Sequence, residues 1–171
     1  MDGIGLGCGD AGDAVAQAKT PQLDLLTQKA AYCALRAHGT AVGLPSDGDM
    51  GNSEVGHNAI GAGRIIDQGA LLVNNAIESG QIYDSEHWQK IIERGRAGGA
   101  LHFIGLLSDG NVHSHERHLH AFLRKVHDEK VSDVCVHVLL DGRDVSETSA
   151  LVYVDRLEAL LKELNSSASD F

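Results

Sequence analysis

The stretch Gly48-Asp-Met-Gly-Asn-Ser-Glu-Val-Gly-His57 places one hydroxyl, that of Ser53, directly after Asn52 and between Gly51 and Gly56. Glycine lets the backbone of a short turn come close to a ligand. A serine at the start of a helix has its oxygen near unpaired backbone N–H groups and the positive end of the helix dipole, where a phosphate or an alkoxide is stabilised. Asn52 or Ser53 could equally serve only as a helix cap, since both residue types are preferred there. The stretch by itself leaves both interpretations open.

The second half of the chain alternates between strand-like and helix-like patterns. The apolar run 100–107 predicts a buried strand, and 134–140 predicts a second strand. Residues 115–128 have the spacing of an amphipathic helix, and 147–164 predict another helix. The inward face of the first of these helices is expected to carry Leu119, Phe122, Leu123 and Val126. This order of strands and helices predicts an α/β fold with a parallel sheet.

The first half has weaker signals. Thr20-Pro21 predicts the start of a helix that ends at Gly39, because proline suits a first helical position and glycine a helix end. Residues 40–44 predict a short strand. Helices are expected over 69–79 and from Asp84 or Ser85 to about residue 94.

Both predicted strands of the second half end directly in polar, glycine-containing segments. These are Ser108-Asp109-Gly110 and Asp141-Gly142-Arg143-Asp144. Ligands of open α/β sheets bind beyond the carboxyl ends of the strands. The sequence therefore predicts a binding site where these two segments meet.

Composition narrows the class of partner. The chain has 171 residues, enough for one ordinary domain, and a net charge of −10. This acidity argues against nucleic acid and anionic membranes as main partners. The 3 cysteines are odd in number and lack C-x-x-C spacing, which indicates reduced thiols in a cytoplasmic protein. The sequence shows neither an apolar run long enough to span a bilayer nor a secretory leader.

Four ordered motifs resemble those of cofactor-independent phosphoglycerate mutases, members of the alkaline phosphatase superfamily. The motifs are Asp2-Gly3-Ile4-Gly5, Gly51 to His57 with Gly61-Ala62-Gly63-Arg64, Ser108 to His115, and Asp141 to Val145. Residues 10–24 further resemble the plant and trypanosomatid branch of that family. The resemblance runs over nearly the whole chain.

The resemblance implies an incomplete α/β protein. Residues 1–67 would be part of the metal- and nucleophile-bearing phosphatase domain, and 68–171 part of the inserted transferase domain that binds substrate. Both ends look cut relative to the family. The parent enzyme is expected to be a monomer that interconverts 3-phosphoglycerate and 2-phosphoglycerate without a bisphosphoglycerate cofactor. The piece alone is expected to be inactive.

Ser53 corresponds by resemblance to the nucleophile that carries the phosphoryl group. A serine hydroxyl is a weak nucleophile, and coordination to a divalent ion activates it. The family uses two such ions, Mn²⁺ or Co²⁺. In this sequence only Asp2 and Ser53 match family metal ligands. Without the resemblance, a turn-forming residue would be the better interpretation of Asp2, because Asp-Gly is a common turn pair.

His113, Arg143 and Asp144 correspond by resemblance to substrate-binding residues, and Asp144 also to a proton-transfer group. An arginine offers a planar, bidentate fork to a carboxylate or phosphate. The alternative for Arg143 and Asp144 is an ordinary surface ion pair. The neighbouring His118 and His120 do not form a His-Glu-x-x-His motif and are expected to be solvated helix residues.

Two other functions stay open on the sequence alone. The chain could belong to another metal-dependent hydrolase of the superfamily, although the segments around His113 and Arg143 argue against this, since they match the mutase's inserted domain. It could also be a non-enzymatic remnant, which is the better interpretation if 171 residues is the natural length.

Overall fold

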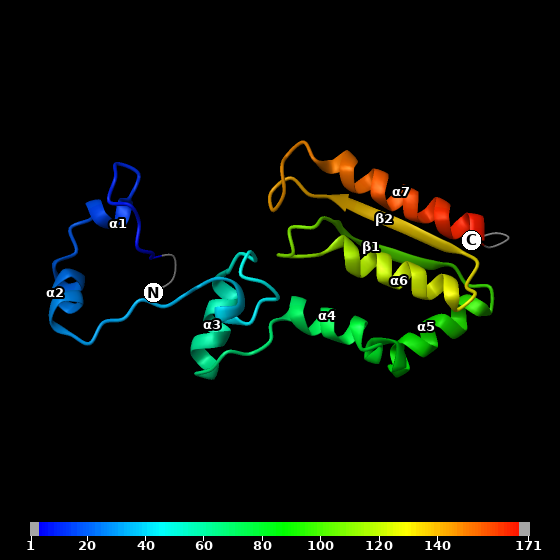
Figure 1. Ribbon diagram of the computed structural model, residues 1–171, viewed down its shortest axis with the longest axis horizontal. Helices are drawn as coiled ribbons and strands as arrows, with labels where there is room; N and C mark the ends of the chain where they lie inside the picture. Colours follow the sequence, from blue (N-terminus) through cyan, green and yellow to red (C-terminus); the bar gives the residue numbers. More distant parts are fainter. Residues whose placement is uncertain (1–3, 168–171) are drawn as a thin grey trace.

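A computed structural model describes residues 4–167 of the chain. The first half holds α1 (Ala14–Gln17), α2 (Pro21–Lys29), the 3₁₀ helix η1 (Gly39–Val42), α3 (Ser53–Ala62) and α4 (Gly69–Glu78). The second half holds the 3₁₀ helix η2 (Gln81–Asp84), α5 (Glu86–Arg96), β1 (Leu101–Leu107), α6 (Glu116–Asp128), β2 (Val134–Leu140) and α7 (Ala150–Ser167). Figure 1 shows the sheet with α5, α6 and α7 at one end of an elongated molecule and α1 and α2 at the other.

The predicted α/β fold with a parallel sheet is confirmed. β1 and β2 pair in parallel, in a register that runs from Leu101 opposite Val134 to Leu107 opposite Leu140. Helix α6 is the crossover between them, as a parallel pair requires. Both strands therefore end at the same edge of the sheet.

The core lies between the sheet and the helices of the second half. One cluster joins Leu107 of β1 and Leu123 of α6 to the buried stripe of α7. That stripe is Tyr153, Leu157, Leu160 and Leu164, which recur at helical spacing. A second cluster packs Trp88 and Ile92 of α5 against Val126 and Val131. The inward face predicted for α6 is confirmed, with Leu123 and Val126 fully buried.

The prediction that β1 is a buried strand is wrong for one face of the sheet. Phe103, Val136 and Val138 pack into the cluster formed by α6 and α7. On the opposite face, the side chains of Ile104 and Leu139 are 74% and 61% exposed. Both helices cover the same face, so the described chain leaves the other face open.

Two predictions for the first half are also wrong. Residues 40–44 form no strand, because Gly43 has a positive φ of 84° and ends η1. A side-chain carbon at Gly43 would lie 1.7 Å from the carbonyl oxygen of Ile66, so only glycine fits there. Helix α2 begins at Pro21 as predicted but stops at Lys29 instead of Gly39. None of the residues 4–38 is buried, so no packed surface supports the rest of that helix.

The division into residues 1–67 and 68–171 stays a prediction. Val42, Leu44 and Val55 form a small cluster of their own before this boundary. Gln68 then ties the two parts together: its backbone N–H donates to Gly43 O, and its side-chain amide donates to Val42 O, both at 2.9 Å.

Leu123 tests the assignment of the core. Leu123→Ala should lower the free energy of unfolding by about 2–5 kcal/mol, because it opens a cavity between α6, α7 and the sheet. Leu151→Ala is the matched control: that side chain is 72% exposed, and the change should stay within about 0.5 kcal/mol. Urea unfolding followed by circular dichroism measures both, and equal effects would contradict the packing described here.

Candidate active site

Ser53 is the first residue of α3, as the sequence predicts. Asn52 is the cap: its side-chain oxygen accepts the backbone N–H of Val55 at 3.1 Å. The side chain of Ser53 is exposed, and its Oγ lies 3.2 Å from Nδ1 of His57. The capping interpretation therefore holds for Asn52, while the Ser53 hydroxyl lies at the N-terminal end of the helix.

His57 does not act as a base for Ser53 in this geometry. Its Nδ1 lies 2.7 Å from the carbonyl oxygen of Ser53. A carbonyl oxygen only accepts, so Nδ1 carries the proton and donates it there. That nitrogen then has no lone pair for the proton of the serine hydroxyl. A nucleophilic role for Ser53, which the resemblance implies, would need another activating group.

The two glycines around Ser53 differ in what they allow. A side-chain carbon at Gly51 would lie 1.8 Å from the carbonyl oxygen of Ala37, so this glycine permits a close approach of the chain to itself. A side-chain carbon at Gly56 would meet nothing within 4 Å. The glycine-assisted approach of a ligand, predicted for the whole turn, is therefore wrong at Gly51, whereas Gly56 has open space beside it.

One hydrogen bond connects the Ser53 turn to the sheet. The side-chain amide of Asn111, in the loop after β1, donates to Asp49 Oδ1 at 2.7 Å. Ser46 holds the other oxygen of Asp49 through its backbone N–H and its hydroxyl. These donors lower the pKa of Asp49 despite its partial burial, so it accepts as a carboxylate. The loop that contains His113 is thus tied to the segment that precedes Ser53.

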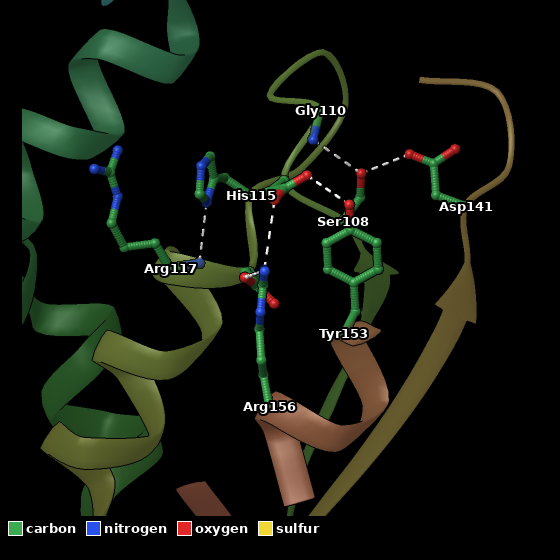
Figure 2. Close-up of polar contacts among 9 residues, drawn as sticks. Ser108, Gly110, His115, Arg117, Asp141, Tyr153 and Arg156 are labelled. Carbon is green, nitrogen blue, oxygen red and sulfur yellow. Dashed lines mark hydrogen bonds and ion pairs between the residues drawn. The ribbon is translucent and has the colours of Figure 1, made fainter. Parts of the chain in front are cut away.

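The two strand ends meet through Ser108 and Asp141 (Figure 2). Ser108 is 1% exposed, and its hydroxyl donates to Asp141 Oδ2 at 2.5 Å. The same Oγ accepts the backbone N–H of Gly110 at 3.1 Å. The carbonyl oxygen of Ser108 accepts the N–H of Glu116 at 2.6 Å, which closes the base of the loop that contains His113.

Asp141 accepts hydrogen bonds from the backbone of the loop that follows β2. Its Oδ1 accepts the backbone N–H groups of Gly142, Arg143 and Asp144 at 2.7, 2.9 and 3.1 Å. The hydroxyl of Ser108 and these N–H groups lower the pKa of Asp141 to about 2. The backbone of the turn that contains Arg143 and Asp144 is therefore held by hydrogen bonds to one carboxylate.

Of the three predicted substrate-binding residues, His113 and Asp144 lie close together, and the side chain of Arg143 is hydrogen-bonded to neither. His113 Nε2 lies 3.9 Å from Asp144 Oδ2. Arg143 is exposed, and no hydrogen bond or ion pair within residues 4–167 holds its guanidinium. The alternative of an Arg143–Asp144 ion pair is therefore wrong, because Asp144 faces His113 instead. A side-chain carbon at Gly110 would lie 2.7 Å from Asp144 Cβ, so the two loops touch only because residue 110 is glycine.

The sequence reasoning missed a charged group supplied by α7. The hydroxyl of Tyr153 donates to Asp109 Oδ1 at 2.7 Å. Arg156 Nη1 lies 2.7 Å from Glu116 Oε1 and 3.5 Å from Asp109 Oδ2. Figure 2 shows Tyr153 and Arg156 rising from α7 toward the end of β1. Their three-residue spacing puts them on one helix face, but nothing local in the sequence pairs them with Asp109.

His118 and His120 are not the solvated residues that were predicted. His118 Nε2 lies 2.6 Å from Asn74 Oδ1 of α4, so it joins that helix to α6. His120 is half-buried, and its Nε2 has no hydrogen-bond partner. Burial lowers the pKa of both rings and favours the neutral form. The sequence could not show that α4 packs beside α6.

The described residues do not fit a metal site by themselves. Between residues 4 and 167, no three His, Cys, Asp or Glu side chains form a group able to hold a metal ion. Of the two predicted ligands, Asp2 lies outside the described residues and Ser53 is one hydroxyl. A divalent ion would need further ligands.

Two further predictions concern the chain as a whole. Cys8, Cys33 and Cys135 are free thiols, as predicted. Over residues 4–167, no helix has both the length and the apolar character needed to cross a membrane.

Comparison with known proteins gives a consistent family match. The family described as "BPG-independent PGAM N-terminus" matches residues 73–169. Relatives named 2,3-bisphosphoglycerate-independent phosphoglycerate mutase include those of Zea mays, 48% identical, and Trypanosoma brucei brucei, 46% identical. Each alignment covers 99% of this chain and 31% of the relative. A plant and a trypanosomatid are thus among the relatives, as the resemblance of residues 10–24 implies.

A solved structure agrees with these sequence matches. The phosphoglycerate mutase of Leishmania mexicana, determined at low cobalt concentration, has a TM-score of 0.84 and 46% identity to this chain. The match covers 98% of this chain and 31% of that protein. The chain therefore spans about a third of the length of the relatives it matches.

The titration of Asp141 tests the junction of the two loops. Because the folded pKa, about 2, lies below the ordinary 3.8, the carboxylate stabilises the fold above pH 4. That contribution is lost as the pH falls from about 4 to about 2. Ser108→Ala should raise the pKa of Asp141, because it removes the largest cause of the shift.

Carboxyl-carbon NMR measures this pKa in the chain and in Ser108→Ala. Ser166→Ala is the control, since that hydroxyl donates to Glu163 O on the exposed side of α7. A pKa of Asp141 near 3.8 in the unsubstituted chain would refute the hydrogen-bond pattern.

Proposed function

Since the chain belongs to the 2,3-bisphosphoglycerate-independent phosphoglycerate mutase family, we propose that it supplies the nucleophile turn and the substrate-binding loops of such an enzyme. The complete polypeptide would interconvert 3-phosphoglycerate and 2-phosphoglycerate through a phosphoserine, without a bisphosphoglycerate cofactor. We place it in the cytoplasm as a monomer that acts on this small molecule and on neither nucleic acid nor membranes.

The hydrogen bond between Asn111 and Asp49 is the observation that carries this proposal. Its two partners are 62 residues apart in the chain. It joins the loop that contains His113 to the segment that leads into Ser53. A serine and an anion-binding loop that are tied together suit the transfer of a phosphoryl group between them.

Ser53 would be the group that changes covalently. Its Oγ would attack the phosphorus of the bound phosphoglycerate, so that the Oγ–P bond forms while the bond from phosphorus to the substrate oxygen breaks. The released glycerate would stay bound, and in the second step its other hydroxyl would lose its proton and attack the phosphorus. The Oγ–P bond would then break, which restores the hydroxyl of Ser53. Because Ser53 lies at the start of α3, the positive end of the helix dipole and the backbone N–H groups there would stabilise the negative charge on the phosphoryl oxygens.

The strand-end loops would hold the glycerate between the two steps. The unpaired guanidinium of Arg143 offers two parallel N–H groups to a carboxylate or phosphate. Asp144 would exchange a proton with the glycerate hydroxyls, and His113 beside it would donate to the anionic part of the substrate. His113 and Arg143 are exposed, which leaves this surface accessible to a small molecule, while the side chain of Asp144 is mostly buried.

Two divalent ions, Mn²⁺ or Co²⁺, are part of the proposal for the complete enzyme. Such ions lower the pKa of a bound hydroxyl and neutralise phosphate charge. Asp2 and Ser53 are the ligands this chain would contribute. Since the described residues alone do not fit a metal site, the remaining ligands would come from the other two thirds of an enzyme of this family.

The chain alone should therefore lack mutase activity. Purified chain is incubated with Mn²⁺ or Co²⁺ and 3-phosphoglycerate, and 2-phosphoglycerate is followed by coupled absorbance. Turnover that survives repurification and disappears in Ser53→Ala would show that this third of the family's length is sufficient, against the expectation.

A chimera tests the proposed roles of the residues. The 171 residues replace the matching segment of the Leishmania mexicana enzyme, which is 46% identical. Arg143→Lys keeps the charge but loses the fork. A charge-assisted hydrogen bond contributes about 1.5–3 kcal/mol, so kcat/KM should fall roughly ten- to hundredfold.

Asp144→Asn in the same chimera should mainly lower kcat, because it removes a proton acceptor and not a binding charge. Ser53→Ala should abolish phosphoryl transfer. Arg124→Lys serves as the control for arginine substitution, since that side chain pairs with Glu163 between α6 and α7, away from the loops. Near-normal kinetics for a folded Arg143→Lys would remove Arg143 from the site.

A further inference from the structure

Asp141 lies where the two strand ends meet, and its carboxylate accepts hydrogen bonds from both strand-end loops. One of its oxygens accepts three successive backbone N–H groups, those of residues 142–144. The other accepts the hydroxyl of the buried Ser108 at 2.5 Å. Both oxygens are thus occupied by the protein itself, so this carboxylate has little capacity left for a ligand.

We infer that Asp141 is a positioning residue, which, with Ser108, fixes the turn that presents Arg143 and Asp144 to the substrate. The inference rests on the proposed function and extends it to two residues outside the substrate-binding set. Gly142 and Arg143 of this turn are exposed, so side-chain packing constrains this part of its backbone little. Three hydrogen bonds to one fixed carboxylate supply that constraint instead.

Ser108 extends the constraint to the neighbouring loop. Its Oγ accepts the N–H of Gly110, and its carbonyl oxygen accepts the N–H of Glu116, so it holds both ends of the loop that contains His113. Gly110 in turn touches Asp144. The Ser108–Asp141 hydrogen bond therefore sets the distance between His113 on one loop and Asp144 on the other.

Steady-state kinetics of the chimera test the inference. Asp141→Ala should lower kcat/KM at least tenfold, with KM raised through Arg143 and kcat lowered through Asp144. The kcat/KM of Asp141→Asn should lie between that of Asp141→Ala and that of the unsubstituted chimera, because the amide oxygen of asparagine still accepts the three N–H groups. Asp128→Ala, which removes a side chain that is 71% exposed at the far end of α6, should leave the kinetics unchanged.

Repeating the Asp141→Ala substitution in a chimera that already carries Arg143→Ala distinguishes a positioning role from a general effect on stability. In Arg143→Ala, the further change Asp141→Ala should no longer raise KM by more than about twofold, whereas its effect on kcat through Asp144 should persist. A residue that only stabilises the fold would raise KM by the same factor in both backgrounds. Circular dichroism and urea midpoints show which variants are folded under assay conditions.

Two results would overturn the inference while the proposed function stands. They are unchanged kinetics in a folded Asp141→Ala, and an equal rise of KM in both backgrounds. An inactive unsubstituted chimera, with a folded structure and the parent Leishmania enzyme active in the same assay, would instead overturn the proposed function, and the role of Asp141 with it.

Discussion

The parallel pairing of β1 with β2 is the constraint on which the rest of the second half depends. Parallel strands need a crossover, and α6 supplies it while it buries Leu123 and Val126 against the sheet. The pairing also brings both strand ends to one edge, where Ser108 meets Asp141 at 2.5 Å. Without that register, the loops that contain His113 and Asp144 would have no common base.

Stability and the candidate chemistry occupy different parts of this edge. Ser108 is buried and Asp141 is saturated with donors, whereas Arg143 and Ser53 are exposed. The first pair gains hydrogen bonds from the fold, and the second pair lies at the surface in contact with solvent. The first segment of the molecule differs from this edge of the sheet. Residues 4–38 bury no side chain, so they gain little hydrophobic stabilisation from the rest of the described chain.

Sequence periodicity predicted the helices and strands whose apolar residues face the core. The helices α5, α6 and α7 and both strands lie close to their predicted bounds, because their apolar residues repeat at the spacing of the element that buries them. Prediction failed over 30–39 and 40–44, where apolar residues suggested regular structure. Residues 30–38 bury no side chain, so no packed surface supports a helix there. Val42 and Leu44 are buried, but residues 40–44 have no partner strand among residues 4–167.

The sequence by itself determined the motifs, their order and the family, because glycine-rich turns and strand-end polar residues are local patterns. Only the tertiary structure decided which of these groups meet. Asp49 reaches Asn111 across 62 residues and Tyr153 reaches Asp109 across 44, and Asp144 faces His113 and not its neighbour Arg143. The physical reason is that such contacts follow from how helices and loops pack on the sheet, which no spacing within one segment encodes. The open face of the sheet has the same origin, since α6 and α7 both pack on one side.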